Sequence, residues 1–491
     1  MQLDDRQRRT RGPLASYLSQ PEPPPNLKPP GRGADLPPGP RMPHLASTVY
    51  TAIGFWSRRM PFFEQCRARY GTPFTLWMRF PPVPLVWFDD PEHVKAIFQA
   101  PADVLHVGNG SLELEHFFGR TGLAFMEEDE HLTRRKVVNR SAHGEELQRV
   151  NVAMREIVAR EVAAWPRETP FDVWPFARRL VLQAVLQVSF GDDPDERIRE
   201  LLDVLERMMA FNEHFISILA TQEMPSPVVR ALALYPPFRR FLALRARADR
   251  LIYDLIADGR RSGEARGMLG ILLAEQLPAV EIRDEIMTFV LAGSATTTSG
   301  TCWGIERLAR DRDARERIRA EIAVDGDETY LTAFVCELLR CKPPLPAAIP
   351  RTVMKPFELD GRVYPVGTRL VVGTYLLHHN PAVYPDPYAF RPERFLERPP
   401  GLFSWTPFGG GRRKCLGKAV AESEIRTILR EVLARYELDV VGEPVGVPSA
   451  PHLAVLKPVR RVRLAPAAQP DRAMQAREPT AAAAASRRSS P

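Results

Sequence analysis

The feature that most constrains this chain is a glycine-rich loop that leads into a single cysteine. Residues 404–424 read SWTPFGGGRRKCLGKAVAESE. Three consecutive glycines favour a tight loop, because glycine adopts positive φ without steric cost. The apolar spacing after Cys415 predicts a helix, so the cysteine lies at a helix N-terminus, where the helix dipole and the neighbouring Arg412, Arg413 and Lys414 favour a thiolate. The loop therefore predicts a site that holds sulfur as an anion.

Several uses of such a thiolate can be compared. A nucleophilic cysteine needs a histidine base within reach, and no histidine lies nearby in the sequence. A zinc ion needs three or four ligands, usually with cysteine pairs at short spacing, which Cys415 lacks. A single thiolate is sufficient as the axial ligand of a haem iron. The remaining alternative is an ordinary buried loop cysteine.

The spacing around Cys415 resembles the haem-binding signature Phe-x-x-Gly-x-Arg-x-Cys-x-Gly of the cytochrome P-450 family. The matching positions are Phe408, Gly411, Arg413, Cys415 and Gly417, and Ala421 and Glu424 continue the pattern into the following helix. The resemblance implies the cytochrome P-450 fold, mainly α with small β-sheets, with the haem between a long central helix and the cysteine-loop helix. It also implies haem b (iron protoporphyrin IX) as the cofactor, with Cys415 as its axial thiolate and metal ligand.

Composition indicates a globular protein and does not favour nucleic-acid binding. Of the 491 residues, 44% are hydrophobic and 26% charged, and the net charge of +7 is scattered, so nucleic-acid binding is not expected. The five cysteines are odd in number and unpatterned, which argues against disulfides and for a reducing compartment, the cytoplasm. No apolar run of ~18 residues and no secretory signal is present, so we expect a soluble protein without a transmembrane anchor.

The chain divides into three predicted regions. Residues 1–45 are rich in Pro, Arg and Gly and predict a disordered arm. Residues 46–465 form the single catalytic domain, and the resemblance covers roughly residues 36–465. Residues 466–491 contain an alanine run and predict a disordered tail.

The first structured elements are a helix, a hairpin and a second helix. A helix is predicted from Pro61 to a stop at residues 70–73, and strands over 74–80 and 84–88 predict a hairpin. Residues 91–98 predict a further helix, followed by a loop over residues 101–124.

Two segments are expected to enclose a substrate pocket. In the resembled family, the loop over residues 101–124 covers the pocket, which makes Val107, Leu112, Phe117 and Phe118 candidate lining residues. The resemblance places the pocket roof at residues 208–241, where the apolar side chains are Met208, Met209, Phe211, Phe215, Tyr235 and Phe238. An apolar lining suggests a hydrophobic substrate, although core packing explains the same residues.

Four basic residues are candidate ligands of the haem propionates. His131 and Arg135 are four residues apart on a predicted helix and therefore share one face. Alone, such a pair is typical of a solvated helix surface. The resemblance implies that both reach the propionates, together with Arg351 and Arg413, and arginine matches a carboxylate bidentately.

A long helix over about 279–312 is expected to cross the active site. Its segment Ala-Gly-Ser-Ala-Thr-Thr-Thr (292–298) contains weak helix formers, which often accompany a local bulge at a functional site. The resemblance assigns catalysis to Gly293, Ala295, Thr296 and Thr297, with Thr296 as the alcohol that helps to deliver protons. Ala295 departs from the family pattern, which has an acid there. Two expectations follow: a water chain, Ser294 or a substrate group replaces the acid, or oxygen activation is poorly coupled.

Three charged residues are predicted to stabilise the cysteine loop. Glu337 and Arg340 match the family's Glu-x-x-Arg motif, and Arg394 belongs to its Pro-Glu-Arg-Phe segment. The resemblance implies a buried structural network of these three residues. Removing one partner from a buried charge network costs about 3–5 kcal/mol.

The resemblance implies a monooxygenase that inserts one oxygen atom from dioxygen into a hydrophobic small molecule, a fatty acid, terpene, steroid or polyketide. The chain contains no flavin- or iron–sulfur-binding stretch, so electrons are expected from a separate ferredoxin or flavodoxin with its reductase. The basic residues Arg412, Arg413, Lys414 and Lys418 suggest where such an acidic partner docks. A peroxygenase or isomerase, suggested by Ala295, and a non-catalytic haem-binding protein are the alternatives.

Overall fold

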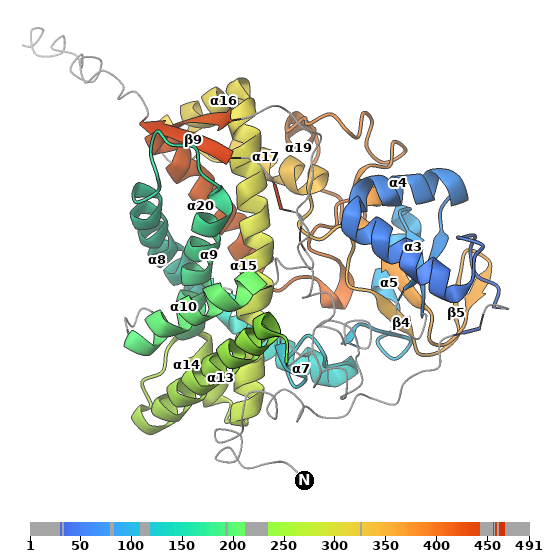
Figure 1. Ribbon diagram of the computed structural model, residues 1–491, viewed down its shortest axis with the longest axis horizontal. Helices are drawn as coiled ribbons and strands as arrows, with labels where there is room; N and C mark the ends of the chain where they lie inside the picture. Colours follow the sequence, from blue (N-terminus) through green and yellow to red (C-terminus); the bar gives the residue numbers. More distant parts are fainter. Residues whose placement is uncertain are drawn as a thin grey trace, which may run out of the picture.

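The computed structural model shows a mainly helical protein with a long helix through its centre and a small sheet on one side (Figure 1). It describes residues 30–31, 34–78, 83–108, 118–142, 144–191, 195–211, 234–324, 327–441, 455, 457–458 and 461–466. Its α-helices are α3 (His44–Ser57), α4 (Arg59–Tyr70), α5 (Pro91–Gln99), α7 (Glu128–Asn139), α8 (Gly144–Ala163), α9 (Val173–Phe190), α10 (Glu196–Phe211), α13 (Pro236–Ser262), α14 (Gly267–Ala274), α15 (Ala279–Arg310), α16 (Arg312–Ala323), α17 (Thr329–Cys341), α18 (Thr374–His378), α19 (Glu393–Glu397) and α20 (Lys418–Arg435). The 3-10 helices are η3 (Arg140–Ala142) and η4 (Gly411–Arg413).

A five-stranded sheet joins segments that are far apart in the sequence. The described strands of all the sheets are β1 (Phe74–Met78), β2 (Val83–Phe88), β3 (Leu105–His106), β4 (Arg351–Val353), β5 (Phe357–Leu359), β6 (Arg362–Tyr364), β7 (Arg369–Val372), β8 (Tyr436–Val441) and β9 (Arg461–Pro466). The large sheet has the order β1-β2-β7-β4-β3, in which only β2 and β7 are parallel. Strands β1 and β2 form the predicted hairpin, and β5–β6 and β8–β9 are separate pairs. The sheet thereby places Arg351, at the start of β4, beside the N-terminal part of the fold.

The end of the predicted N-terminal arm packs against β1. Thr75 donates from its backbone N to Pro38 O at 2.8 Å and from its Oγ1 to Pro37 O at 2.8 Å. A Cβ on Gly39 would overlap Thr75 O, so glycine permits this close approach. The rest of the predicted arm and nearly all of the tail over residues 466–491 lie outside the described residues, as do Leu112, Phe117 and Phe215.

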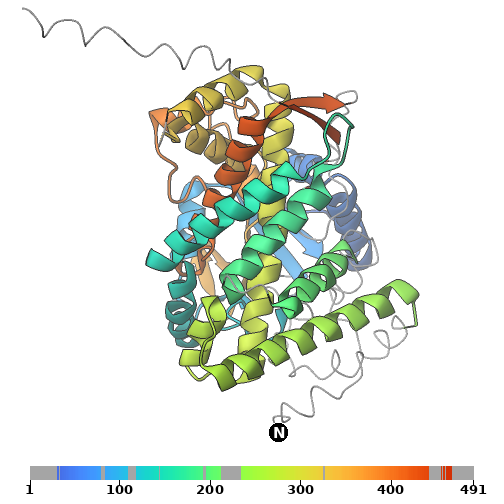
Figure 2. The ribbon, with the colours of Figure 1, turned by 90° about the vertical axis from the view of Figure 1, so that its left-hand side faces the viewer.

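Helix α15 forms the centre of the helical core, with α8 and α9 crossing it in the second view (Figure 2). It packs closely on α20, because two glycines face that helix. A Cβ on Gly300 would lie 2.7 Å from Ile425 Cδ1, and one on Gly304 would lie 3.0 Å from the Leu429 side chain. No helix among the described residues has both the length and the apolar character needed to cross a membrane.

The weak helix formers at residues 292–298 do not interrupt α15. Ser294 Oγ donates to Val290 O at 2.5 Å, Thr296 Oγ1 to Ala292 O at 2.7 Å, and Thr298 Oγ1 to Ser294 O at 2.7 Å. Each hydroxyl is thus satisfied by the carbonyl one turn earlier within the same helix. The expected local bulge is therefore wrong, since the segment is continuous α-helix.

Glu337, Arg340 and Arg394 lie together in the interior, connected to the cysteine loop. Arg340 Nε donates to Glu337 Oε2 at 2.7 Å, and Arg394 Nε donates to Glu337 Oε1 at 3.2 Å. Arg340 Nη1 donates to His378 O at 2.7 Å, and the ring Nε2 of His378 accepts from Thr406 N at 2.9 Å. A chain of hydrogen bonds therefore extends from the charge network to the start of the cysteine loop.

Candidate functional site

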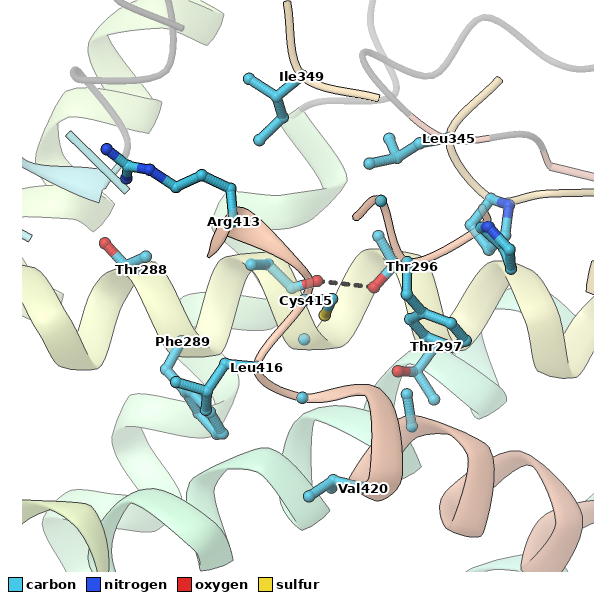
Figure 3. A pocket seen from close by; sticks show the side chains of 18 of the residues that line it. Thr288, Phe289, Thr296, Thr297, Leu345, Ile349, Arg413, Cys415, Leu416 and Val420 are labelled. Carbon is cyan, nitrogen blue, oxygen red and sulfur yellow. Dashed lines mark hydrogen bonds between the residues drawn. The ribbon is translucent and has the colours of Figure 1, made fainter. Parts of the chain in front are cut away.

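A cavity of about 330 Å³ lies between α15 and the cysteine loop. Figure 3 shows side chains from three parts of the chain converging on it. Thr288, Phe289, Thr296 and Thr297 come from α15, Arg413, Cys415, Leu416 and Val420 from the cysteine loop and α20, and Leu345 and Ile349 from the segment before β4. Most of the lining is apolar, so the cavity suits a hydrophobic molecule.

Glycines position the cysteine loop tightly against α5. Gly411 has φ 63°, and a Cβ there would overlap the carbonyl oxygen of Phe98. A Cβ on Gly410 would overlap the ring of the same phenylalanine. Cys415 N donates to Phe408 O at 2.9 Å, which closes the loop on itself. The loop thus directs Cys415 into the cavity through backbone conformations that side-chain-bearing residues rarely adopt.

The thiol of Cys415 is exposed to the cavity but lies inside the protein. Burial raises its pKa, and the N–H of Gly417 and the charges of Arg135 and Lys414 oppose this only in part. The positive surroundings predicted to favour a thiolate are therefore present, but burial has the larger effect. A metal ion bound to the sulfur removes the proton outright, so the site suits a metal-bound thiolate better than a free one.

Four basic residues lie together at one edge of the cavity. Burial, followed by the charges of Arg413, Arg135 and Arg351, lowers the pKa of His131 to about 3. Burial and the charge of Arg413 lower the pKa of Arg351 to about 10. Arg135 Nη2 donates to Lys414 O at 2.7 Å. The arrangement concentrates positive charge where a bound anion would be stabilised.

The two cavity-lining arginines differ in how well they are paired. Arg413 is ion-paired with Glu127 and donates to Leu123 O at 3.4 Å. Arg351 has its Nε buried without a partner among the described residues, and its Nη2 reaches only Gly410 O, at 3.4 Å. A buried guanidinium with an unused donor indicates a missing anionic ligand.

These observations test whether a haem fits the site. The cavity offers one thiol on its floor, an apolar wall on α15, and an unpaired guanidinium at its edge. A planar, largely apolar ring system with an iron at its centre and carboxylates at its edge matches all three features. Elsewhere in the described chain, no cluster of three or more His, Cys, Asp or Glu side chains is arranged to hold a metal ion. The residues present therefore fit a haem group.

The predicted catalytic residues on α15 are divided between the cavity and the core. Gly293, Thr296 and Thr297 line the cavity. Ala295 instead packs against the hydrophobic core. Ser294, one of the suggested replacements for the missing acid, is fully buried, and its Oγ lies 3.4 Å from Met209 Sδ, away from the cavity lining. Of the replacements suggested for the acid, water and a group on the substrate therefore remain.

The predicted pocket loop and roof contribute less to the cavity than expected. Val107 lines it, whereas Phe118 packs against the hydrophobic core beside Phe125. The roof residues Met208, Met209, Phe211 and Phe238 are also core residues, so their prediction as pocket lining is wrong for the described chain. Core packing, the alternative interpretation, accounts for them.

Sequence reasoning missed the polar lining residues Glu285, Thr288, Thr374 and Thr406, and it named Glu424 only as part of the pattern that continues into the helix after Cys415. Glu424, on α20, is 1% exposed, has an Oε1 without a partner among the described residues, and has a pKa raised well above 4.5 by burial. Glu285 and Thr288 precede the catalytic segment on α15. The spacing 285, 288, 292, 296 follows one helix face and could have identified the first two.

Comparisons with known proteins agree with this geometry. A family model described as "Cytochrome P450" matches residues 37–464. "Putative cytochrome P450 137" of Mycobacterium tuberculosis is 35% identical over 387 residues, which cover 76% of this chain and 79% of that protein. "Putative cytochrome P450 135B1" of Mycobacterium bovis is 30% identical over 445 residues, covering 87% and 91%. A solved structure titled "Retinoic acid bound cyanobacterial CYP120A1" has the same fold, with a TM-score of 0.71, 21% identity, and coverage of 85% of this chain and 96% of that one.

Proposed function

The chain belongs to the cytochrome P450 family and is a haem monooxygenase, and on this premise we propose that Cys415 supplies the axial thiolate of a haem b in the cavity beneath α15. The observation that carries the proposal is that Cys415 and Thr296 line one apolar cavity with the unpaired Arg351 at its edge. When bound, the haem supplies the redox chemistry that activates dioxygen for insertion of one oxygen atom into the substrate.

The protein's own residues would hold the haem propionates and present the cysteine to the cavity. Arg351 contributes an unused donor for a propionate, and Arg135 and His131 lie beside it with a neutral imidazole that accepts or donates one hydrogen bond. Arg413 is held by Glu127, so its contribution to a propionate is shared with that carboxylate. Phe408, Gly411 and Gly417 shape the loop that presents Cys415.

On the cavity wall formed by α15, Thr296 is the residue that takes part in proton delivery. Thr296 Oγ1 donates a hydrogen bond to Ala292 O, so its lone pairs can accept a hydrogen bond from a water molecule in the cavity. Thr297 and Gly293 line the same wall, where the small glycine leaves room for a reacting molecule. Ala295 offers no acid, so protons reach Thr296 through water or through the substrate.

The substrate is a hydrophobic small molecule, because the lining is mostly apolar. Fatty acids, terpenes, steroids and polyketides are the classes that suit it. Val185, Phe289 and Ala292 are among the apolar lining residues, which limit the access of water to the reacting carbon.

Electrons are proposed to come from a separate ferredoxin or flavodoxin with its reductase. Arg412 and Lys414 are exposed beside the cysteine, whereas Lys418 is half-buried, paired with Glu422 at 3.0 Å. We therefore expect Arg412→Glu to raise the Michaelis constant for the redox partner more than Lys418→Glu does. No effect of either substitution would refute this docking face. Since all five cysteines are free, a reducing compartment such as the cytoplasm suits the protein.

The decisive experiment is the absorption spectrum of the dithionite-reduced protein under carbon monoxide. A strongly red-shifted Soret band that is lost in Cys415→Ala establishes thiolate ligation. Absence of a haem band refutes the proposal and leaves Cys415 as an ordinary buried loop cysteine. A haem band without the shift shows that another residue is the axial ligand.

A peroxygenase or isomerase remains the second candidate, because Ala295 removes the acid from the expected proton path. Retention of Thr296 in the cavity wall favours the monooxygenase. Turnover supported by hydrogen peroxide as well as by a reductase system would favour the second candidate instead.

A further inference from the structure

Glu285 and Thr288 form one polar part of a cavity whose lining is mostly apolar. They lie three residues apart on α15, so they share one helix face, and both line the cavity. Figure 3 shows Thr288 at the end of the cavity where Arg413 lies, away from Leu345. Nothing in the proposed oxygen chemistry uses either residue.

The hydroxyl of Thr288 has no hydrogen-bond partner among the described residues, and its Oγ1 is buried. It lies beneath the loop that follows Phe118, since a Cβ on Gly122 would be 2.8 Å from that oxygen. Threonine in a helix populates two χ1 rotamers, and rotation here breaks no hydrogen bond. A ligand at this position requires the rotamer in which the hydroxyl and the methyl group exchange places, so that the hydroxyl of this lining residue faces the cavity.

Glu285 offers a second polar group beside it. Leu123 N donates to Oε1 at 3.0 Å and Arg134 Nη1 donates to the same oxygen at 3.2 Å. Both of these donors in the described chain therefore use one oxygen and leave Oε2 for a ligand. Burial raises the pKa of this carboxyl to about 7, while Leu123 N and Arg134 oppose the rise.

The adjacent loop is fastened to α15, which holds this polar part of the cavity in a fixed position. Thr121 donates to Asp284 Oδ2 from its backbone N at 3.0 Å and from its Oγ1 at 2.7 Å. Arg283 Nη1 donates to Asp284 Oδ1 at 2.8 Å and to Phe118 O at 3.2 Å. Both carboxylate oxygens of Asp284 thus accept hydrogen bonds from the protein. At this end of the cavity, Glu285 and Thr288 are therefore the polar side chains that can bind a ligand.

The charge balance selects a neutral ligand group. A carboxylate would be repelled by Glu285. The charge of Glu285 is already offset by Arg134, which also pairs with Glu281, so an ammonium group would meet arginines without gaining a free counter-charge. A hydroxyl donates to Glu285 Oε2 and accepts from Thr288 Oγ1, which satisfies both residues without adding charge.

We propose that Glu285 and Thr288 form a hydroxyl-binding subsite, so that the substrate of this enzyme is an apolar alcohol whose hydroxyl is anchored there. The inference rests on the proposed haem-thiolate function, because it concerns the substrate of the same cavity. The anchor leaves the apolar remainder of the molecule to extend along α15 towards Cys415.

Matched ligand pairs test the subsite in the haem-loaded protein. The probes are linear primary alcohols of ten to fourteen carbons and farnesol, each with its methyl ether and with the corresponding carboxylic acid. Dissociation constants are measured at pH 7.4 from the spin-state shift of the Soret band. We expect at least one alcohol to bind about threefold to tenfold more tightly than its ether, since a net hydrogen bond is of that strength. We expect the acid to bind no better than the ether.

Variants assign the preference to the subsite. The preference for the alcohol over its ether depends on the acceptor Glu285, so Glu285→Met should abolish it. Thr288→Val keeps the shape but removes a donor that the alcohol and the ether can both use, so both should bind more weakly, and Thr288→Ser should keep their wild-type affinities. Thr406→Val is the matched control, because Thr406 also lines the cavity and also has a buried Oγ1 without a partner in the described chain, but it lies on the cysteine loop. This control should keep the wild-type affinities and the preference.

The outcomes distinguish a failure of the subsite from a failure of the proposed haem-thiolate function. Loss of the red-shifted carbon monoxide band in the wild type overturns the proposed function itself. With that band intact, the subsite is refuted if no alcohol is preferred over its ether, if acids bind as tightly as alcohols, or if no probe shifts the spectrum. The wild-type comparison is sufficient for this even if Thr288→Val does not fold.

Discussion

Replacing Glu337 by methionine should cost more stability than almost any other single change in α17. The carboxylate is completely buried and accepts from Arg340 at 2.7 and 2.8 Å, from Arg394 at 3.2 Å and from Arg391 N at 2.8 Å. Methionine has a similar volume but leaves two buried guanidinium groups without a counter-charge. Removing one partner of a buried ion pair costs about 3–5 kcal/mol.

The assay is urea unfolding of the haem-loaded protein, followed by tryptophan fluorescence, with the midpoints compared at equal slope. The matched control is Glu431→Met on α20, whose partner Arg435 is 44% exposed, so its loss should cost about 0–1 kcal/mol. Because the network is bonded through His378 to Thr406 N, Glu337→Met should also weaken the red-shifted carbon monoxide band. A loss of stability no larger than that of the control would refute the reasoning.

Three further changes test the site. Arg351→Gln removes a guanidinium whose buried Nε has no partner in the described chain, so haem should transfer to apomyoglobin at least about tenfold faster, as expected for loss of a hydrogen bond between charged groups. An unchanged rate would exclude a propionate contact. In Gly411→Ala the new Cβ is strained by a φ of 63° and also overlaps the carbonyl of Phe98, whereas in Gly409→Ala it is strained by a φ of 64° but lies in open space. Only Gly411→Ala should therefore abolish the red-shifted carbon monoxide band. Equal spectra of the two variants would contradict this. The raised pKa of Glu424 means that the folded protein keeps a proton that the unfolded chain releases above pH 4.5, so the stability that Glu424 contributes should fall as pH rises above that value, by at most about 1.4 kcal/mol per pH unit. Between pH 5.5 and 8, the urea midpoint of the wild type should therefore decrease relative to that of Glu424→Gln, and equal changes in the two proteins would contradict this.

Local patterns were sufficient to predict some elements. The hairpin β1–β2 and the long helix α15 follow from spacing and turn residues, because their chemistry is contained in adjacent residues. The segment at 292–298 shows the limit of such reasoning. Its composition suggested a bulge, but the hydroxyl groups bond to carbonyls one turn earlier and the helix continues.

Burial could not be predicted from residue type. The aromatic and methionine side chains near Met208 had two interpretations, and the structure places those it describes in the core. Phe118 likewise turns to the core, while Val107 lines the cavity. The choice depends on how α10 and α13 pack on α9 and α15, which is a long-range property.

The sequence by itself determined the glycine loop, the position of its cysteine and the spacing of the charged motifs, because each depends on neighbouring residues. The tertiary structure alone decided which charges meet and which stay unpaired. It brings Arg351 of β4 beside His131 of α7, and it places Leu123 N on Glu285 of α15. These residues are far apart in the sequence and come into contact only when the chain folds. The folded packing also excludes water, which shifts their pKa values and leaves some hydrogen-bond donors and acceptors without a partner.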